Sequence, residues 1–204
     1  MSLKIYGIAA SRAFRTLWMA KELGLGYQHI PVTWTDGGTR TKKFLAINPN
    51  GFVPAIEDGQ FKLWESMAIN LYLAKKHGSG KLYPKALKDE ALAWQWSFWA
   101  TTELEKPMQA YVQHTVTLPP EKRDAKIADE NGAKVAKALA VLNGALAKQP
   151  YLLGKSFKVA DFNVASVLYV AFRLKVDLNA PKVAKWLKAC LERPAALEAR
   201  KLRE

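Results

Sequence analysis

The first part of the chain alternates between extended and helical patterns of apolar residues. Residues 3–7 alternate apolar and polar positions, as a half-buried strand does. Residues 11–24 then place apolar side chains three and four positions apart, from a capping serine at Ser11 to a terminating glycine at Gly24. Residues 27–32 predict a second strand. Two strands joined by one helix form a β-α-β unit, so we expect these two strands to be parallel.

The next segment predicts a short helix, a hairpin and a longer helix. Residues 42–47 have a weak helical pattern, and residues 53–57 and 61–64 are predicted strands that a turn at 58–60 joins into a hairpin. A helix over residues 66–76 completes the order β-α-β-α-β-β-α. This order predicts a thioredoxin-like α/β domain.

Residues 77–84 interrupt the regular pattern with glycine, serine and proline, and they predict a domain boundary. Beyond this break the strand signals almost vanish. We therefore expect two domains, an α/β domain over residues 1–79 and an all-α helical bundle over residues 86–204. The predicted helices of the bundle are 86–114, 121–148, 160–174, 181–191 and 194–202.

The charge of the chain is strongly basic, with 31 Lys and Arg against 18 Asp and Glu and a formal net charge of +13. The excess is spread over both halves, mostly at helical spacing among Ala and Leu, and no basic tail or nucleic-acid motif accompanies it. This pattern is typical of a solvated surface. We expect no nucleic-acid partner.

Cysteine content and apolar runs limit the class of protein further. Cys190 is the only cysteine, which excludes an intramolecular disulfide and a cysteine-rich metal site, and we expect no metal. No apolar run approaches the ~20 residues of a membrane span, and the first residues lack the apolar segment of a signal peptide. The sequence predicts a cytoplasmic protein without a membrane partner.

The segment from Asn48 to Ser66 carries the chemistry. Residues 48–52 (N-P-N-G-F) predict a turn, after which Pro54 stands at the start of a strand and leaves the N–H and C=O of Val53 without a ladder partner. Those groups could pair with an extended peptide-like ligand. Ser66 begins a helix whose N–H groups can bind a carboxylate, and the carboxylate of Glu65 can bind an ammonium group.

The pattern N-P-N-G-F-V-P at residues 48–54, followed by E-S-M-A-I-x-x-Y-L at residues 65–73, resembles the glutathione-binding half of the glutathione S-transferase family. The resemblance covers essentially the whole chain and points to the bacterial-type, serine-containing cytosolic class. It implies an enzyme that conjugates the thiolate of its co-substrate glutathione to a small hydrophobic electrophile.

The resemblance implies that Ser11, which follows the first strand at the start of the first helix, is the catalytic residue that stabilises the thiolate of glutathione. A free thiol has a pKa near ~8.5, so a donor placed against the sulfur near a helix N-terminus favours the thiolate. The alternative for Ser11 is a purely structural helix cap. Tyr6, a few residues earlier, is the alternative activating residue. The absence of a cysteine beside Ser11 excludes C-x-x-C oxidoreductases and the family branch that forms a mixed disulfide with glutathione.

The remaining glutathione contacts also come from the resemblance. Val53 would pair its backbone with the cysteinyl amide, before a cis-Pro54, and Glu65 and Ser66 would hold the γ-glutamyl end. A cation would bind the glycine carboxylate; this cation is Arg40 or, in an alternative register, Lys42. The implied glutathione-binding residues are Arg40, Val53, Pro54, Glu65 and Ser66.

Further expectations concern residues around this site. Arg12 and Arg15 lie nearby in the sequence, and Arg15 could instead pack against the helical domain. A second, apolar substrate would lie between the domains against Trp96, Trp99, Thr102 and Glu103, although such an aromatic stripe can equally be core.

The family also implies a homodimer. Alternatives are a non-catalytic binding module on the same fold, or a glutathione-dependent isomerase, dehalogenase or peroxidase.

One departure from the family pattern lies before the predicted helix at 160–174. The family caps this helix with a Ser or Thr and an Asp three residues later, each bonding to the backbone of the other. Here Lys158 takes the first position and Asp161 the second. We therefore expect Asp161 to accept a hydrogen bond from the Lys158 N–H while the reciprocal bond is missing. A lost cap costs ~0.5–2 kcal/mol, which the fold can tolerate.

Overall fold

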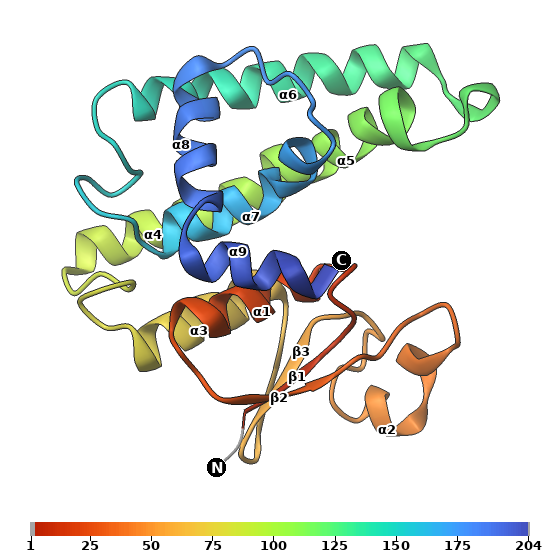
Figure 1. The fold of residues 1–204 in the computed structure, drawn as a ribbon, viewed down its shortest axis with the longest axis vertical. Coiled ribbons are helices and arrows are strands. Elements are labelled where there is room, and N and C mark those ends of the chain that lie inside the picture. The colour runs from red at the N-terminus through yellow and green to blue at the C-terminus, as the bar shows by residue number, and fades with distance from the viewer. Residues whose placement is uncertain (1–2, 204) are drawn as a thin grey trace. The chain divides into compact units, whose positions relative to one another are not determined.

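The computed structural model describes residues 3–203, and they form two compact units (Figure 1). One unit, here called the N-terminal unit, contains residues 3–83 and 192–203. The other, the helical unit, contains residues 84–191.

A four-stranded mixed sheet forms the centre of the N-terminal unit, with strand order β2-β1-β3-β4. Its strands are β1 (Leu3–Tyr6), β2 (Tyr27–Ile30), β3 (Ala55–Asp58) and β4 (Phe61–Trp64). Strand β1 runs parallel to β2 and antiparallel to β3, and β3 and β4 form the expected hairpin. The thioredoxin-like order expected from the sequence is confirmed. Strand β4 has the predicted limits, and the limits of β1, β2 and β3 differ from the predicted ones by at most two residues.

The helices of this unit are α1 (Ala13–Glu22), α2 (Lys42–Leu45) and α3 (Ser66–His77), with a 3-10 turn, η1, at Gly38–Arg40. Helices α1 and α3 pack against one another. Side chains alternate along a strand, so Ile5 and Tyr6 of β1 lie on opposite faces of the sheet. Tyr6 packs with Phe44 of α2, and this cluster closes the face that carries α2.

The last helix, α9 (Pro194–Arg200), packs on α1 and so belongs to the N-terminal unit, together with a final 3-10 turn, η5, at Lys201–Arg203. The sequence-based boundary had placed all residues after 86 in the helical domain. The difference has a clear physical cause. Arg193 donates from Nε and Nη2 to the two carboxylate oxygens of Glu22, at 2.9 and 2.8 Å, and so attaches the end of the chain to α1.

The helical unit contains α4 (Leu87–Trp99), α5 (Lys106–Val112), α6 (Ala125–Leu146), α7 (Val159–Arg173) and α8 (Pro181–Leu191). Helix α7 is buried along nearly its whole length, as its apolar sequence predicts, and it contacts α4, α5 and α8. The expected helical bundle is therefore present.

The predicted single helix over 86–114 is interrupted by two π-helical segments, η2 (Ala100–Glu105) and η3 (Gln113–Thr117). Pro107 lies just after the first of them. Proline has no N–H, and in a regular α-helix its ring would collide with the carbonyl four residues earlier. The wider π-helical turn avoids this collision.

Helix α6 begins at Ala125 rather than at the predicted Glu121. Residues Pro120–Lys122 form a 3-10 turn, η4, and the side chain of Asp124 caps α6 by accepting from Ile127 N at 3.1 Å. A capping side chain that satisfies the first N–H groups sets the start of the helix here.

The expected half of the cap on α7 is present. Lys158 N donates to Asp161 Oδ2 at 3.0 Å, while the ammonium group of Lys158 has no lone pair with which to accept in return. Asp161 also accepts from Leu152 N and Trp186 Nε1, at 2.8 and 2.9 Å. Burial nevertheless raises the pKa of this carboxyl to about 6.

Across residues 3–203, the structure contains no helix that is both long enough and apolar enough to cross a membrane.

Candidate glutathione-binding site

The register of the sheet brings three parts of the expected site to one edge. Tyr6 of β1 pairs with Ala55 of β3, and Ala55 pairs with Trp64 of β4. One position further along each strand, Gly7, Pro54 and Glu65 therefore follow one another across the same edge of the sheet, at the strand spacing of about 4.8 Å. Residues that are up to 58 positions apart in the chain meet in this way.

Asn48 shapes the loop that leads into this edge. Its buried side chain donates from Nδ2 to Phe52 O at 2.7 Å and accepts through Oδ1 from Asn50 N at 3.0 Å. Gly51 lies between them with φ 66°, a conformation that favours glycine. The side-chain amide of Asn48 thus bonds to two backbone groups of the loop. The loop then continues to Val53 at the edge of the sheet.

The peptide bond between Val53 and Pro54 is cis, as the family resemblance implied. Pro54 is buried and stands just before β3. Within residues 3–203, no hydrogen bond involves the backbone of Val53. These main-chain groups have the arrangement that pairing with an extended peptide requires.

Gly7 allows the loop after β1 to approach Val53 closely. A Cβ atom at Gly7 would lie 2.7 Å from the Cβ atoms of both Ala13 and Val53, and its φ of 122° is one that other residues rarely adopt. A side chain here would push the start of α1 away from Val53. The glycine therefore sets the distance between the Ser11 loop and the Val53 loop.

Arg40 contacts the loop of residues 48–53. Its Nη1 donates to Asn50 O at 3.3 Å, and its guanidinium carbon lies 5.7 Å from the centre of the Phe52 ring. The side chain is exposed, so a charged ligand can reach it. A Cβ atom at Gly51 would lie 2.5 Å from this Nη1, so the glycine leaves room for the arginine. Lys42 is also exposed, at the first position of α2.

Helix α3 begins at Ser66, directly after Glu65, whose φ of 72° is unusual for a residue other than glycine. Ser66 is buried and its Oγ accepts from Nη1 of the buried Arg15 at 3.3 Å. The side chain of Glu65 is exposed. The site therefore combines a helix N-terminus, a buried guanidinium and an accessible carboxylate, which suit the carboxylate and the ammonium group of an α-amino acid.

Ser11 lies at the mouth of α1. Its Oγ accepts from Ala13 N at 3.1 Å and donates to Ile8 O at 2.6 Å. The hydroxyl thus caps the first turn with a lone pair, and its single proton bonds to a carbonyl of the preceding loop. The capping role does not use the proton, so capping and donation to a thiolate are compatible.

Tyr6, the alternative activating residue, is buried beneath α2 and its hydroxyl donates a hydrogen bond to the Glu57 carboxylate. Burial, this hydrogen bond and the negative charge of Glu57 raise the pKa of Tyr6. The same bond lowers the pKa of Glu57, to which Lys4 Nζ also donates at 3.4 Å. The hydroxyl proton of Tyr6 is therefore already used in a hydrogen bond to Glu57.

The expected wall for a second substrate lies on α4 and η2 in the helical unit. Trp96 is buried and packs edge-on against Trp99, with ring centres 5.1 Å apart. Thr102 and Glu103 are exposed, and Thr102 Oγ1 donates to Phe98 O at 3.1 Å. Trp96 is thus mainly a core residue, while Thr102 and Glu103 have accessible side chains.

The sequence had not indicated two contributors to this site. Asn48 was interpreted only as part of a turn, although its side chain organises the loop, and Arg15 was only placed near the site. The sequence signal for the second is an arginine that stands among the apolar positions of a helix just after a glycine loop. Its contact with Ser66, 51 positions away, follows from the packing of α1 on α3.

Comparisons with known proteins agree with this geometry. The family model for the glutathione S-transferase N-terminal domain matches residues 1–75, and the one for the C-terminal domain matches residues 102–194. Glutathione S-transferase GstB of Escherichia coli (strain K12) is 32% identical over 184 residues, which cover 89% of this chain and 88% of that protein. Glutathione S-transferase 4 of Zea mays is 32% identical over 201 residues, which cover 96% of this chain and 90% of that protein.

A solved structure has the same fold along nearly the whole chain. It is a theta class glutathione S-transferase from the citrus canker pathogen Xanthomonas axonopodis pv. citri, with glutathione bound. It has a TM-score of 0.90 and 32% sequence identity, and the match covers 97% of this chain and 96% of that one. With both family domains matched in order and relatives similar over most of their length, the chain belongs to the glutathione S-transferase family.

Proposed function

We propose that this protein is a glutathione transferase that joins the sulfur of glutathione to a small hydrophobic electrophile. The observation that carries the proposal is the edge of the sheet where the loop after β1, cis-Pro54 and the start of α3 meet. Relatives named glutathione S-transferases, and a related structure that contains glutathione, support it.

Glutathione binds along this edge as an extended tripeptide. Its cysteinyl amide pairs with the N–H and C=O of Val53, as a short added strand would. Ser66 and the N–H groups of α3 hold the γ-glutamyl carboxylate, and Glu65 holds the ammonium group. Arg40 binds the glycine carboxylate, with Lys42 as the alternative cation.

This pose directs the thiol toward Ser11 at the mouth of α1. The thiol proton leaves to solvent, and the Ser11 hydroxyl turns from Ile8 O to donate a hydrogen bond to the thiolate. The partial positive charge of the α1 N-terminus also favours the anion. The sulfur lone pair then forms a bond to the electrophilic carbon, and the electron pair displaced there goes to the leaving group or to the acceptor atom.

Ser11 is favoured over Tyr6 by the hydrogen bonds that each makes. The Tyr6 hydroxyl is buried against Glu57, an anion whose bond would have to be broken before Tyr6 could serve a thiolate. The Ser11 hydroxyl only exchanges one neutral acceptor for a charged one, which makes the stronger bond.

The experiment measures glutathione affinity and thiol conjugation to an aromatic halide electrophile, for the wild-type protein and Ser11→Ala. We expect the variant to bind glutathione with similar affinity and to lose at least about tenfold in kcat/KM, which corresponds to about 1.4 kcal/mol. A smaller loss would remove Ser11 from the activating role. Failure of the wild type to bind glutathione would overturn the proposal as a whole.

A second candidate is a non-catalytic glutathione-binding module. The 2.6 Å bond from Ser11 to Ile8 O is the observation that favours it, because a hydroxyl that stayed there could not serve a thiolate. This candidate predicts wild-type binding of glutathione without conjugation. The same assays, run with isomerase, dehalogenase and peroxidase substrates, distinguish transfer from the other glutathione-dependent reactions.

We also propose a homodimer, on the basis of exposed aromatic side chains, of which Trp94 and Phe98 lie one turn apart on α4. In the helical unit Phe98 of α4 is 63% exposed and Trp94 is 41% exposed; in the N-terminal unit Phe52 is 65% exposed. Sedimentation of wild type, Phe98→Asp and the control Val141→Asp, a change at a 53% exposed position on α6, tests the proposal. We expect a dimer for the wild type and the control and a monomer for Phe98→Asp. A wild-type monomer would contradict it.

The proposed location is the cytoplasm, where a reducing environment suits a protein whose one cysteine, Cys190, is a buried thiol.

A further inference from the structure

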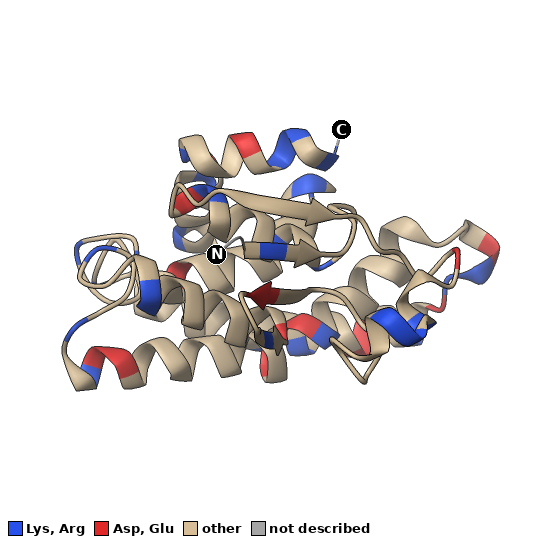
Figure 2. Ribbon diagram, turned by 90° about the horizontal axis from the view of Figure 1, so that it is seen from below, with Lys and Arg blue, Asp and Glu red and all other residues tan. Residues whose placement is uncertain are grey.

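Charge is segregated within the helical unit. Residues 84–130 contain six Lys and Arg against eight Asp and Glu, whereas residues 131–191 contain ten Lys and Arg against two Asp and Glu. One of those two acids, Asp161, is fully buried in the first turn of α7, so only Asp177 is exposed. The overall charge had been interpreted as evenly spread, and Figure 2 shows basic and acidic positions along many elements. The asymmetry becomes visible only inside this unit.

Three of the ten basic residues of the second segment lie on one helix, α8. Helix α8 packs on α6, and Lys182 N donates to Asn143 Oδ1 of α6 at 3.0 Å. We name the α8 basic face by its exposed lysines, which are Lys182, Lys185 and Lys188.

The lysines of α8 lie on one side of the helix. Lys182, Lys185 and Lys188 are exposed, whereas Val183, Trp186, Leu187, Cys190 and Leu191 are buried. Lys182 and Lys188 are separated by about 9 Å along the helix axis, at a rise of about 1.5 Å per residue. This separation is comparable to the Debye length of about 8–10 Å at physiological salt, so the charges act together on a partner.

The chemistry of the face indicates the kind of partner. Nine of the ten basic residues in 131–191 are lysines, which are point charges rather than the planar forks that bind phosphates in pairs. Among the large hydrophobic side chains that are exposed, Val141 alone belongs to this segment, so the face offers no aromatic ring for stacking on bases. A regular lysine surface of this kind suits a partner whose negative charge is spread over a plane.

We propose that the α8 basic face binds the surface of membranes that contain acidic phospholipids. The binding is electrostatic and peripheral, because no helix within residues 3–203 is able to span a bilayer. The sequence-based expectation of no membrane partner had considered only spanning segments. Such binding would hold the protein where apolar electrophiles concentrate, and it is independent of the glutathione site.

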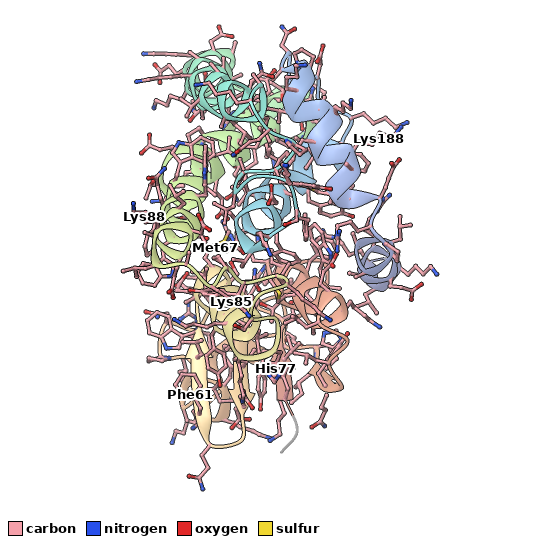
Figure 3. The ribbon with its side chains drawn as sticks, turned by 90° about the vertical axis from the view of Figure 1, so that its left-hand side faces the viewer. Phe61, Met67, His77, Lys85, Lys88 and Lys188 are labelled. Atoms are coloured by element: carbon pink, nitrogen blue, oxygen red, sulfur yellow. The ribbon has the colours of Figure 1, made fainter. Side chains whose placement is uncertain are left out.

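The test is co-sedimentation of the full chain with vesicles that contain phosphatidylglycerol, and with vesicles of phosphatidylcholine alone. The variant is Lys182→Gln/Lys185→Gln/Lys188→Gln. The matched control, Lys88→Gln/Lys122→Gln/Lys126→Gln, removes the same charge from exposed lysines of the acid-rich segment. Figure 3 shows Lys88 on α4 and Lys188 on α8 at opposite sides of the view.

We expect the wild type to bind the acidic vesicles only, with binding that weakens as salt is raised. The α8 variant should lose at least about tenfold in partition coefficient, since each lysine near an acidic surface contributes roughly a fivefold factor. The control should lose less than about threefold. Circular dichroism and glutathione affinity should be unchanged in both variants, which shows that they are folded.

Three results would overturn the proposal. They are a wild type that does not bind acidic vesicles, equal losses in the two variants, and tighter binding to duplex DNA than to vesicles at the same salt. Equal losses would mean that only the net charge of the protein matters. Tighter binding to DNA would identify a nucleic acid as the partner of the face.

Discussion

Hydrogen-bond partners distinguish two hydroxyl groups that occupy similar places in the sequence. Tyr6 and Ser11 stand on either side of Gly7, and both were candidates for activating a thiol. The hydroxyl of Tyr6 is buried against the carboxylate of Glu57, whereas that of Ser11 donates to a neutral carbonyl at the mouth of a helix. The sequence contains no information on these partners, because Glu57 is 51 positions from Tyr6.

Tyr6→Phe tests this distinction. The change should lower the free energy of unfolding by about 1–3 kcal/mol near neutral pH, since it removes a hydrogen bond to a charged group. It should leave kcat/KM for conjugation within about twofold of the wild type. Denaturant titration and the conjugation assay measure the two effects. A loss of activity as large as that of Ser11→Ala would instead support Tyr6 as the activating residue.

The stability cost of Tyr6→Phe should also depend on pH. The hydrogen bond from Tyr6 is the largest cause of the lowered pKa of Glu57 in the folded protein. A lowered folded-state pKa contributes stability above the ordinary glutamate value and loses it as pH falls through the lowered value. The difference in unfolding free energy between wild type and variant should therefore shrink in acid. A difference that is independent of pH would contradict this account.

At the scale of elements, helix ends depend on capping chemistry that the sequence reveals only in part. The start of α6 is set by Asp124, and the π-helical turn η2 comes just before Pro107. At α7 the family-type cap is incomplete, because Lys158 cannot accept a hydrogen bond from the backbone of Asp161. This helix is the buried centre of its unit, so its cap has consequences for the whole bundle.

Lys158→Ser should complete the reciprocal cap. The serine Oγ can accept from Asp161 N while Asp161 keeps its bond from residue 158 N, and the unfolding free energy should rise by about 0.5–2 kcal/mol. Lys155→Ser, in the exposed loop just before, is the matched control and should change stability by less than about 0.5 kcal/mol. Thermal and urea unfolding measure both. An equal rise in the two variants would show that removal of positive charge, rather than the cap, is responsible.

At the scale of the molecule, the two ends of the chain meet in one compact unit. Helix α9 follows the helical unit in the sequence but packs on α1, and Arg193 binds Glu22 across 171 positions. The side chain of Glu22 is only 4% exposed and also accepts from Trp18 Nε1 at 3.1 Å. This ion pair therefore links the segment before α9 to helix α1.

Arg193→Met should destabilise the N-terminal unit by roughly 1–3 kcal/mol, because it removes two hydrogen bonds from a buried carboxylate. Lys201→Met is the matched control. It breaks the pair with Glu198, in which the two side chains are 67% and 55% exposed, and should leave the free energy of unfolding nearly unchanged. Hydrogen exchange of α1 amides and urea unfolding report the effects. Equal costs would mean that the Glu22 pair contributes no more than an exposed one.

The sequence by itself determined most of the elements and the thioredoxin-like order, because periodicity, turn residues and caps are local properties. It also supplied the candidate residues of the glutathione site, which stay a prediction. The tertiary structure decided which residues far apart in the sequence lie next to each other. Pairing of Tyr6, Ala55 and Trp64 brings Gly7, Pro54 and Glu65 to one edge, and packing of α1 on α3 brings Arg15 to Ser66. These contacts join residues up to 58 positions apart, and their free energy depends on the register and burial of the folded chain. The same reason explains why α9 joined the N-terminal unit, whereas the uneven charge of the helical unit is a property of the sequence itself.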